Sequence, residues 1–137
     1  MKDRTIIFAL AALLSIAAAP VLAQDASGTW LTESGETRVR IAPCGGNYCG
    51  TVVWQKTPGK DVNNPDASKK NRPVVGINMF TGKKSGDGEW TGQLYNFQEG
   101  KTYNGKLKVS GPNALTLSGC IMGGIICRSQ TWTRVGG

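Results

Sequence analysis

Residues that could carry out chemistry are few in this chain, because none of its 137 residues is histidine. Histidine is the usual general base near neutral pH and the commonest metal ligand, so Ser-His-Asp and Cys-His catalytic arrangements are ruled out. An enzyme would need carboxylates, an arginine and tyrosines gathered in one cleft. The residues available for such a cleft are Asp61, Asp66, Arg72, Tyr95 and Tyr103. We assign no catalytic residue and expect no enzymatic activity, no metal and no cofactor.

Four cysteines fall into two short pairs, each of which encloses a Gly-Gly step. Gly-Gly is a signal for a two-residue hairpin turn. If Gly123-Gly124 is such a turn, Cys120 lies directly opposite Cys127, at a separation that a disulfide accepts. We predict the disulfides Cys44–Cys49 and Cys120–Cys127, each stabilising the fold by about 2–2.5 kcal/mol. The alternative is a redox-active thiol pair, but the chain has no Cys-x-x-Cys motif.

Short alternating segments follow residue 23 and indicate β-strands. Residues 36–41 show the pattern most clearly, with Thr37, Val39 and Ile41 on one face and charged side chains on the other. Further strands are expected at 29–33, 48–55, 74–80, 90–97, 102–109, in the run through Leu115 and Leu117 to Cys120, and at 128–135. Residues 57–73 are expected to form a long polar loop, and residues 82–88 a turn-rich loop.

These segments, with no amphipathic helix among them, indicate an all-β fold. About eight short sequential strands joined by hairpin turns predict a small antiparallel barrel or sandwich. We favour the barrel, because closure removes exposed strand edges and lets a small domain stay monomeric. The interior of a barrel of about eight strands holds side chains or one small ligand.

The N-terminus has the pattern of a secretory signal peptide. Lys2 and Arg4 precede an apolar run over residues 6–19, and Pro20 and a cleavage site after Ala23 follow it. An uncleaved anchor is the alternative, but the run is shorter than the roughly 20 residues that span a bilayer. We therefore expect a signal peptide at 1–23 and a single domain at 24–137, located in the periplasm or secreted. Once the signal peptide is cleaved, no transmembrane segment is expected.

The chain carries a formal net charge of +7, which attracts anions in general. Its basic residues are scattered, and the only doublets are Lys69-Lys70 and Lys83-Lys84. Nucleic acid is therefore not expected as a partner, whereas anionic envelope polymers and lipid headgroups are candidates.

The long polar loop contains the sequence Asp61-x-Asn63, which is weakly similar to a calcium-binding loop. It lacks the glycine and the glutamate that such a loop requires, so we expect a hydrogen-bonded turn instead. Arg72 lies at the end of this loop, before the expected strand, and is expected to fix the loop by pairing with Asp61 or Asp66. The functional alternative is that Arg72 guards a barrel mouth and binds an anionic headgroup through its planar guanidinium.

A series of short motifs runs along the chain. The motifs are Gly28-x-Trp30, Cys44-Gly45, Cys49-Gly50, Asn64-Pro65-Asp66, Arg72-Pro73, Tyr95-Asn96 and Gln130-Thr131-Trp132-Thr133-Arg134. Together they resemble a known bacterial family of exported proteins, the domain of unknown function 2147. The resemblance covers residues 28–135, and the order and spacing of the motifs make it specific. This resemblance implies an exported β-barrel of lipocalin-like, or calycin-like, architecture, and it implies no established activity.

A looser similarity to lipocalins supports the barrel. Lipocalins begin with Gly-x-Trp and end with an arginine that packs over that tryptophan, and Gly28, Trp30 and Arg134 match this pattern. The contact would seal one end of the barrel and be worth roughly 0.5–2 kcal/mol. We expect Trp132 to have a structural packing role as well.

Two hypotheses for function follow. The first is a barrel that binds a small apolar or anionic amphiphilic molecule, with a candidate site made of Trp54, Arg72, Tyr95, Phe97 and Tyr103. These aromatic side chains either line a cavity or fill it. The second is a structural or interaction protein of the cell envelope that binds another protein or an anionic polymer through its basic surface.

Overall fold

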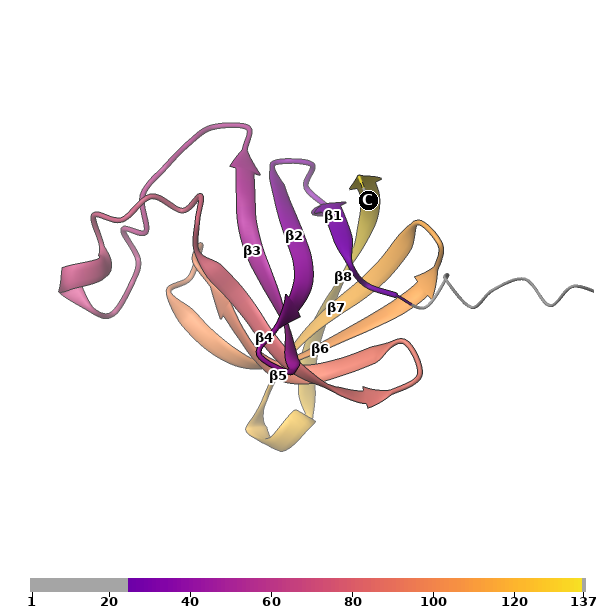
Figure 1. Cartoon of the computed structure of the whole chain (residues 1–137). Helices are drawn as coiled ribbons and strands as arrows, with labels where there is room; N and C mark the ends of the chain where they lie inside the picture. Colours follow the sequence, from indigo (N-terminus) through magenta and orange to yellow (C-terminus); the bar gives the residue numbers. More distant parts are fainter. Residues whose placement is uncertain (1–24, 137) are drawn as a thin grey trace, which may run out of the picture.

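Each strand pairs with the strand before it in the sequence, and the last strand returns to pair with the first (Figure 1). The computed structural model describes residues 25–136, so the expected signal peptide lies outside the described residues. The strands are β1 (Gly28–Leu31), β2 (Thr37–Cys44), β3 (Asn47–Gln55), β4 (Asn78–Gly86), β5 (Glu89–Asn96), β6 (Lys101–Gly111), β7 (Ala114–Ile121) and β8 (Ile126–Gly136). All pairs are antiparallel and close an eight-strand barrel, which confirms the predicted fold class.

Because neighbouring strands run antiparallel, their connections alternate between the two ends of the barrel. The connections β1–β2, β3–β4, β5–β6 and β7–β8 lie at one end, which we call the open end. The two-residue turns 45–46, 87–88 and 112–113 lie at the other end, with the start of β1 and the end of β8, and we call it the closed end.

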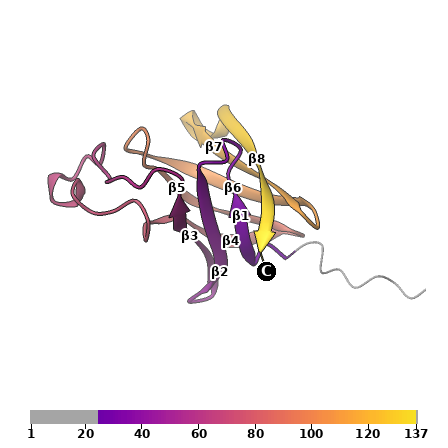
Figure 2. The same ribbon diagram turned by 90° about the horizontal axis from the view of Figure 1, so that it is seen from above.

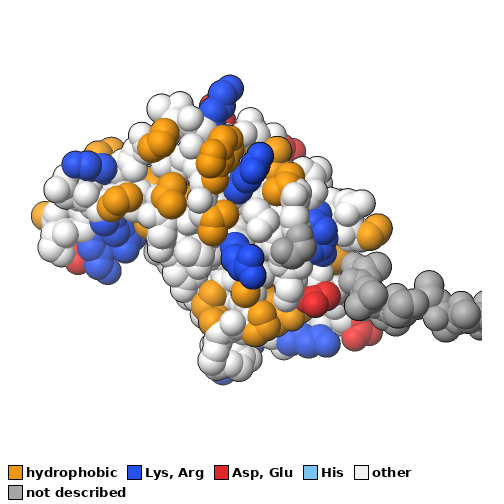
Figure 3. Space-filling model, turned by 45° about the horizontal axis from the view of Figure 1, so that its top comes forward, with side chains coloured by type: hydrophobic (Ala, Val, Ile, Leu, Met, Phe, Trp, Pro, Cys, Tyr) orange, Lys and Arg blue, Asp and Glu red, His pale blue; other side chains and the backbone are white. Residues whose placement is uncertain are grey.

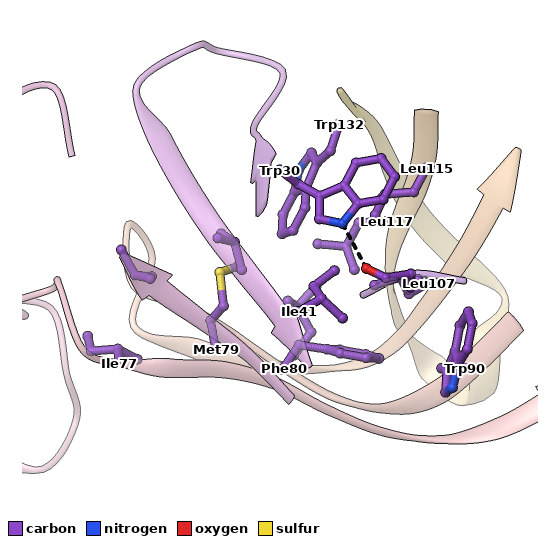
Figure 4. Packing of buried hydrophobic residues seen from close by; sticks show 14 of the residues in the cluster. Trp30, Ile41, Ile77, Met79, Phe80, Trp90, Leu107, Leu115, Leu117 and Trp132 are labelled. Carbon is purple, nitrogen blue, oxygen red and sulfur yellow. Dashed lines mark hydrogen bonds between the residues drawn. The ribbon is translucent and has the colours of Figure 1, made fainter. Parts of the chain in front are cut away.

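The alternation predicted for β2 is present. Thr37, Val39 and Ile41 are buried, whereas Arg38 and Arg40 are exposed. The inward side chains of successive strands meet in one hydrophobic core (Figure 4). Its strand residues are Trp30, Val39, Ile41, Val52, Met79, Phe80, Trp90, Leu94, Leu107, Val109, Leu115, Leu117 and Trp132, and three residues outside the strands, Ala26, Val74 and Ile77, pack with them.

A β-bulge in β3 overrides the period-two pattern that the sequence suggests. Val52 is buried, so strict alternation would place Trp54 inside as well. The register shifts between Arg38 and Val39, which pair with Trp54 and Val52 respectively, so Val53 is the extra residue. As a result Trp54 lies beside Arg38 on the outer surface, with the guanidinium carbon 4.8 Å from its ring centre.

Strand β4 differs from the prediction at both ends. The expected strand at 74–80 begins only at Asn78, and the expected loop at 82–88 is instead the continuation of the strand to Gly86. Gly82 pairs with Gly92 there, and a side chain on Gly82 would lie 2.6 Å from the ring of Phe80. Gly82 is therefore a packing position, where the absence of a side chain makes room for Phe80.

Both predicted disulfides are present, Cys44–Cys49 across the β2–β3 hairpin and Cys120–Cys127 across the β7–β8 hairpin. Cys120 and Cys127 pair directly, as expected. The turn that joins β7 to β8 is longer than predicted, because it includes the one-turn 3-10 helix η3 (Met122–Gly124) rather than Gly123-Gly124 alone.

The long polar segment 57–73 is a loop, as expected, and includes the short 3-10 helix η2 (Ala67–Lys69). It projects from the barrel wall in both views (Figures 1 and 2). No helix among residues 25–136 is long and apolar enough to cross a membrane.

Candidate ligand-binding site

The open end of the barrel leads into a hollow interior. A cavity of about 370 Å³ lies between the strands, and a second cavity of about 510 Å³ adjoins it at the mouth. The two are adjacent and share the lining residues Glu33, Leu94, Asn96, Gln98, Leu117 and Gln130. Each lies within the range of roughly 300–1,000 Å³ that is typical of small-molecule sites.

The inner cavity is lined by both apolar and polar side chains. Its apolar side chains are Met79, Leu94, Phe97, Leu117 and Trp132. Its polar side chains are six neutral ones and one carboxylate, namely Thr32, Glu33, Ser34, Thr37, Asn96, Gln98 and Gln130. This combination suits a ligand with an apolar body and a polar end.

The interior is hollow at this end because the inward positions of β7 and β8 no longer carry large apolar side chains toward the open end. Leu115 and Leu117 fill the space, but the next inward position of β7 is Gly119. On β8, buried Trp132 is followed toward the open end by Gln130, which pairs with Leu117 and accepts a 2.7 Å hydrogen bond from the Trp132 indole.

The mouth carries charges of both signs. Glu33, Glu99, Lys101 and Arg128 line the outer cavity, together with Tyr103. The Tyr103 hydroxyl donates a 2.7 Å hydrogen bond to the Glu99 carboxylate, which raises the pKa of the tyrosine. Arg128 lies 3.9 Å from Glu99 and is 90% exposed, so its guanidinium is available to a charged group that enters the mouth.

The closed end is covered by the contact that the lipocalin pattern implied. The Arg134 guanidinium lies 4.3 Å from the centre of the Trp30 ring. Arg134 also donates hydrogen bonds to the carbonyl oxygens of Asp25, Ser27 and Pro112. The Trp30 indole donates a 2.8 Å hydrogen bond to Ala26, drawn in Figure 4. These contacts fix residues 25–27 across the barrel end.

Arg72 anchors the long loop to the outside of the barrel. Its guanidinium forms an ion pair with Asp61 at 2.9 Å, and Asp61 is fully buried. Asp61 also accepts hydrogen bonds from Tyr95 at 2.7 Å and Asn64 at 2.8 Å. Burial raises the pKa of the Asp61 carboxyl, but these hydrogen bonds and Arg72 outweigh it and hold the pKa below its ordinary value. Burial and the bond to Asp61 raise the pKa of Tyr95 to about 12.

The structure separates the five residues that we expected to form one binding site. Phe97 lines the inner cavity and Tyr103 lines its mouth. Trp54 lies on the outer surface because of the bulge in β3. Arg72 and Tyr95 lie together in the loop anchor, with the arginine 5.8 Å from the tyrosine ring. The neighbour of Tyr95, Leu94, faces inward and lines the cavity, so Tyr95 faces outward.

The cleft considered for an enzyme is also divided. Asp61, Arg72 and Tyr95 meet, but their polar atoms satisfy one another. Asp66 caps η2 by accepting a hydrogen bond from Ser68. Tyr103 lies at the barrel mouth.

Sequence reasoning missed most of the cavity wall. Gln130 and Met79 line the cavity, but neither was expected to be a binding residue. The alternation of side chains along β8 would have placed Gln130 inside the barrel, because it lies two residues from the buried Trp132. Met79 is inward beside inward Phe80 because the β3–β4 register shifts between Gly50 and Thr51, which no pattern in the sequence indicates.

A closed eight-strand antiparallel barrel with one sealed end and a cavity at the other defines a lipocalin-like fold. The fold is similar to that of protein HP1028 from the human pathogen Helicobacter pylori, described as belonging to the lipocalin family. The two share 22% sequence identity with a TM-score of 0.71, over 81% of this chain and 83% of that one. Among curated proteins, none matches this chain.

The chain belongs to DUF2147, a family of uncharacterized proteins conserved in bacteria, whose model matches residues 28–134. The family assignment agrees with the resemblance found in the sequence. The two disulfides fit a protein outside the cytoplasm, where oxidising conditions maintain such bonds.

Proposed function

We propose that the protein is an exported, non-catalytic carrier or sensor that binds one small apolar or amphiphilic molecule inside its barrel. The observation that carries this proposal is the cavity of about 370 Å³ with apolar side chains in its wall, which adjoins a charged mouth. An apolar chain or ring would lie against Phe97, Leu117 and Trp132. A polar or anionic headgroup would lie at the mouth, near Tyr103, Lys101 and Arg128.

The lipocalin-like fold supports a binding role. The alternative, a structural protein that acts through its basic surface, rests on the net charge of +7. On the face drawn in Figure 3, Lys and Arg side chains are spread among other side chains rather than gathered in one patch. We favour the cavity because it is a bounded site with a defined chemistry, whereas scattered charges define none.

Export is part of the proposal and rests on the signal-peptide pattern at residues 1–23 and on the two disulfides. Monomeric behaviour is expected, because closure of the barrel leaves no long free strand edge.

Native mass spectrometry of the protein released from its own cell envelope tests the binding function. We expect a mass increment that corresponds to one bound molecule and disappears after organic extraction. Replacement of Gln130 by Trp should abolish the increment, because this side chain lines both cavities. The control is Thr131→Trp on the same strand, since Thr131 is exposed and lies on the outer face. An increment retained by Gln130→Trp would contradict the proposed site.

A further inference from the structure

The tip of the β7–β8 hairpin is an exposed apolar projection. Residues 121–126 read Ile-Met-Gly-Gly-Ile-Ile and contain no polar side chain. Ile121 is 43% exposed, Met122 69%, Ile125 82% and Ile126 50%. Large apolar side chains of this kind normally contribute to a core, so four of them exposed on one turn mark a contact surface. We call residues 121–126 the apolar tip.

The shape of the apolar tip is fixed by the residues beneath it. The Cys120–Cys127 disulfide joins the two strands directly below, and Ile121 pairs with Ile126. The amide of Ile125 donates a hydrogen bond to the Met122 carbonyl at 3.4 Å. Little conformational entropy is therefore lost when another surface takes up these side chains.

The size and flanking charges of the tip indicate what covers it. Six residues are far fewer than the 20–30 per side, roughly, of a stable protein interface. The neighbouring mouth carries exposed Lys101 and Arg128 as well as Glu33 and Glu99. The Glu99 carboxylate already accepts hydrogen bonds from Tyr103 and Asn96. A small apolar projection with adjacent cations is suited to the boundary between the headgroups and acyl chains of an anionic bilayer.

We propose that the apolar tip inserts into the surface of an anionic lipid bilayer and docks the open end of the barrel there. Ile121, Ile126 and Arg128 belong both to this hairpin and to the lining of the outer cavity. Insertion of the tip therefore places the cavity mouth at the lipid surface, with Arg128 at the level of the headgroups. Docking does not require the cavity to be occupied, so it can fail while the proposed binding function stands, and the reverse also holds.

Flotation of the purified protein with vesicles tests the docking. We expect binding to vesicles of equimolar phosphatidylcholine and phosphatidylglycerol, and weaker binding to phosphatidylcholine alone. Ile125→Asp and Met122→Asp should each weaken binding about tenfold, because each removes an apolar side chain that the bilayer would bury. Arg128→Gln should weaken binding to the anionic vesicles and leave binding to phosphatidylcholine unchanged.

Val135→Asp is the matched control, because Val135 is 45% exposed on the same strand at the closed end. It should bind to vesicles as the parent does.

A second readout uses Met122→Trp, whose fluorescence should shift to the blue when anionic vesicles are added. Absence of binding to either vesicle would overturn the proposal, and so would equal loss in Val135→Asp or unchanged binding of Ile125→Asp. The parent protein could instead self-associate without binding vesicles, and Ile125→Asp could abolish that self-association. This result would mean that the apolar tip contacts a second copy of the chain, and it would also overturn the proposal.

Discussion

At the residue scale, the loop anchor depends on one buried carboxylate with three donors. Asp61 is inaccessible to solvent, and Arg72, Tyr95 and Asn64 donate to its two oxygens. Removing one partner of a buried ion pair costs about 3–5 kcal/mol because a charge stays buried. The Arg72 side chain is 38% exposed, so solvent screens the pair and reduces this figure.

We therefore expect Arg72→Met to lower the free energy of unfolding by about 1–3 kcal/mol at pH 7. The pKa of Asp61 lies below its ordinary value, so its contribution is present above about pH 4 and is lost as the pH falls through the folded-state pKa. Without Arg72 the buried Asp61 carboxyl takes up a proton more readily. The difference in free energy of unfolding between variant and parent should therefore become smaller in acid.

Urea denaturation at pH 7 and pH 3 measures this effect. Arg128→Met is the control, because its ion pair with Glu99 is long and exposed, and its change should stay below about 0.5 kcal/mol. An Arg72→Met difference that is the same at both pH values would mean that Arg72 acts by packing against Tyr95 rather than through its charge.

Glycines at the element scale decide how closely the strands approach one another. A Cβ atom on Gly92 would lie 1.8 Å from the carbonyl oxygen of Thr81 on the neighbouring strand β4. Gly111, at the end of β6, has no atom within 4 Å of the same position. The β4–β5 pairing therefore requires glycine at position 92, whereas the β6–β7 pairing does not require glycine at position 111.

From this we expect Gly92→Ala to destabilise the barrel by about 3 kcal/mol or more, since the strand pair must separate to admit the methyl group. Gly111→Ala should change stability by less than about 1 kcal/mol. Thermal unfolding of the two variants followed by circular dichroism makes the comparison. An equal loss of stability in both variants would show that Gly92 is not needed for the close approach of β4 and β5.

The same scale shows how far the sequence could predict the fold. Period-two alternation identified β2, and the Gly-Gly steps between the cysteines located the β2–β3 and β7–β8 hairpins, because each signal depends on neighbouring residues. The bulge that turns Trp54 outward depends on the register between β2 and β3, which local patterns do not encode. The continuation of β4 through Gly82 depends on the Phe80 ring and on Gly92 across the sheet. The candidate site was only partly predicted for the same reason, since a cavity wall is assembled by register.

For the whole molecule, the two ends of the barrel have different roles. Arg134 and Trp30 seal one end with residues 25–27, and the core packs directly beneath them. The other end stays hollow because Gly119 and Gln130 occupy inward positions of β7 and β8 that would otherwise carry large apolar side chains. The disulfide Cys120–Cys127 stiffens the hairpin that overhangs this opening. A sealed base and an open mouth suit the small-molecule carrier proposed above.

The central claim is that the open-end cavity holds an apolar or amphiphilic molecule, and fluorescence titration with cis-parinaric acid tests it most directly. We predict saturable enhancement with one site per chain in the parent and in Thr131→Trp. Binding should weaken at least about tenfold in Gln130→Trp and in Ser34→Trp, which obstruct the interior and its rim respectively. Affinity unchanged in both cavity variants, with their folds intact by circular dichroism, would contradict the account.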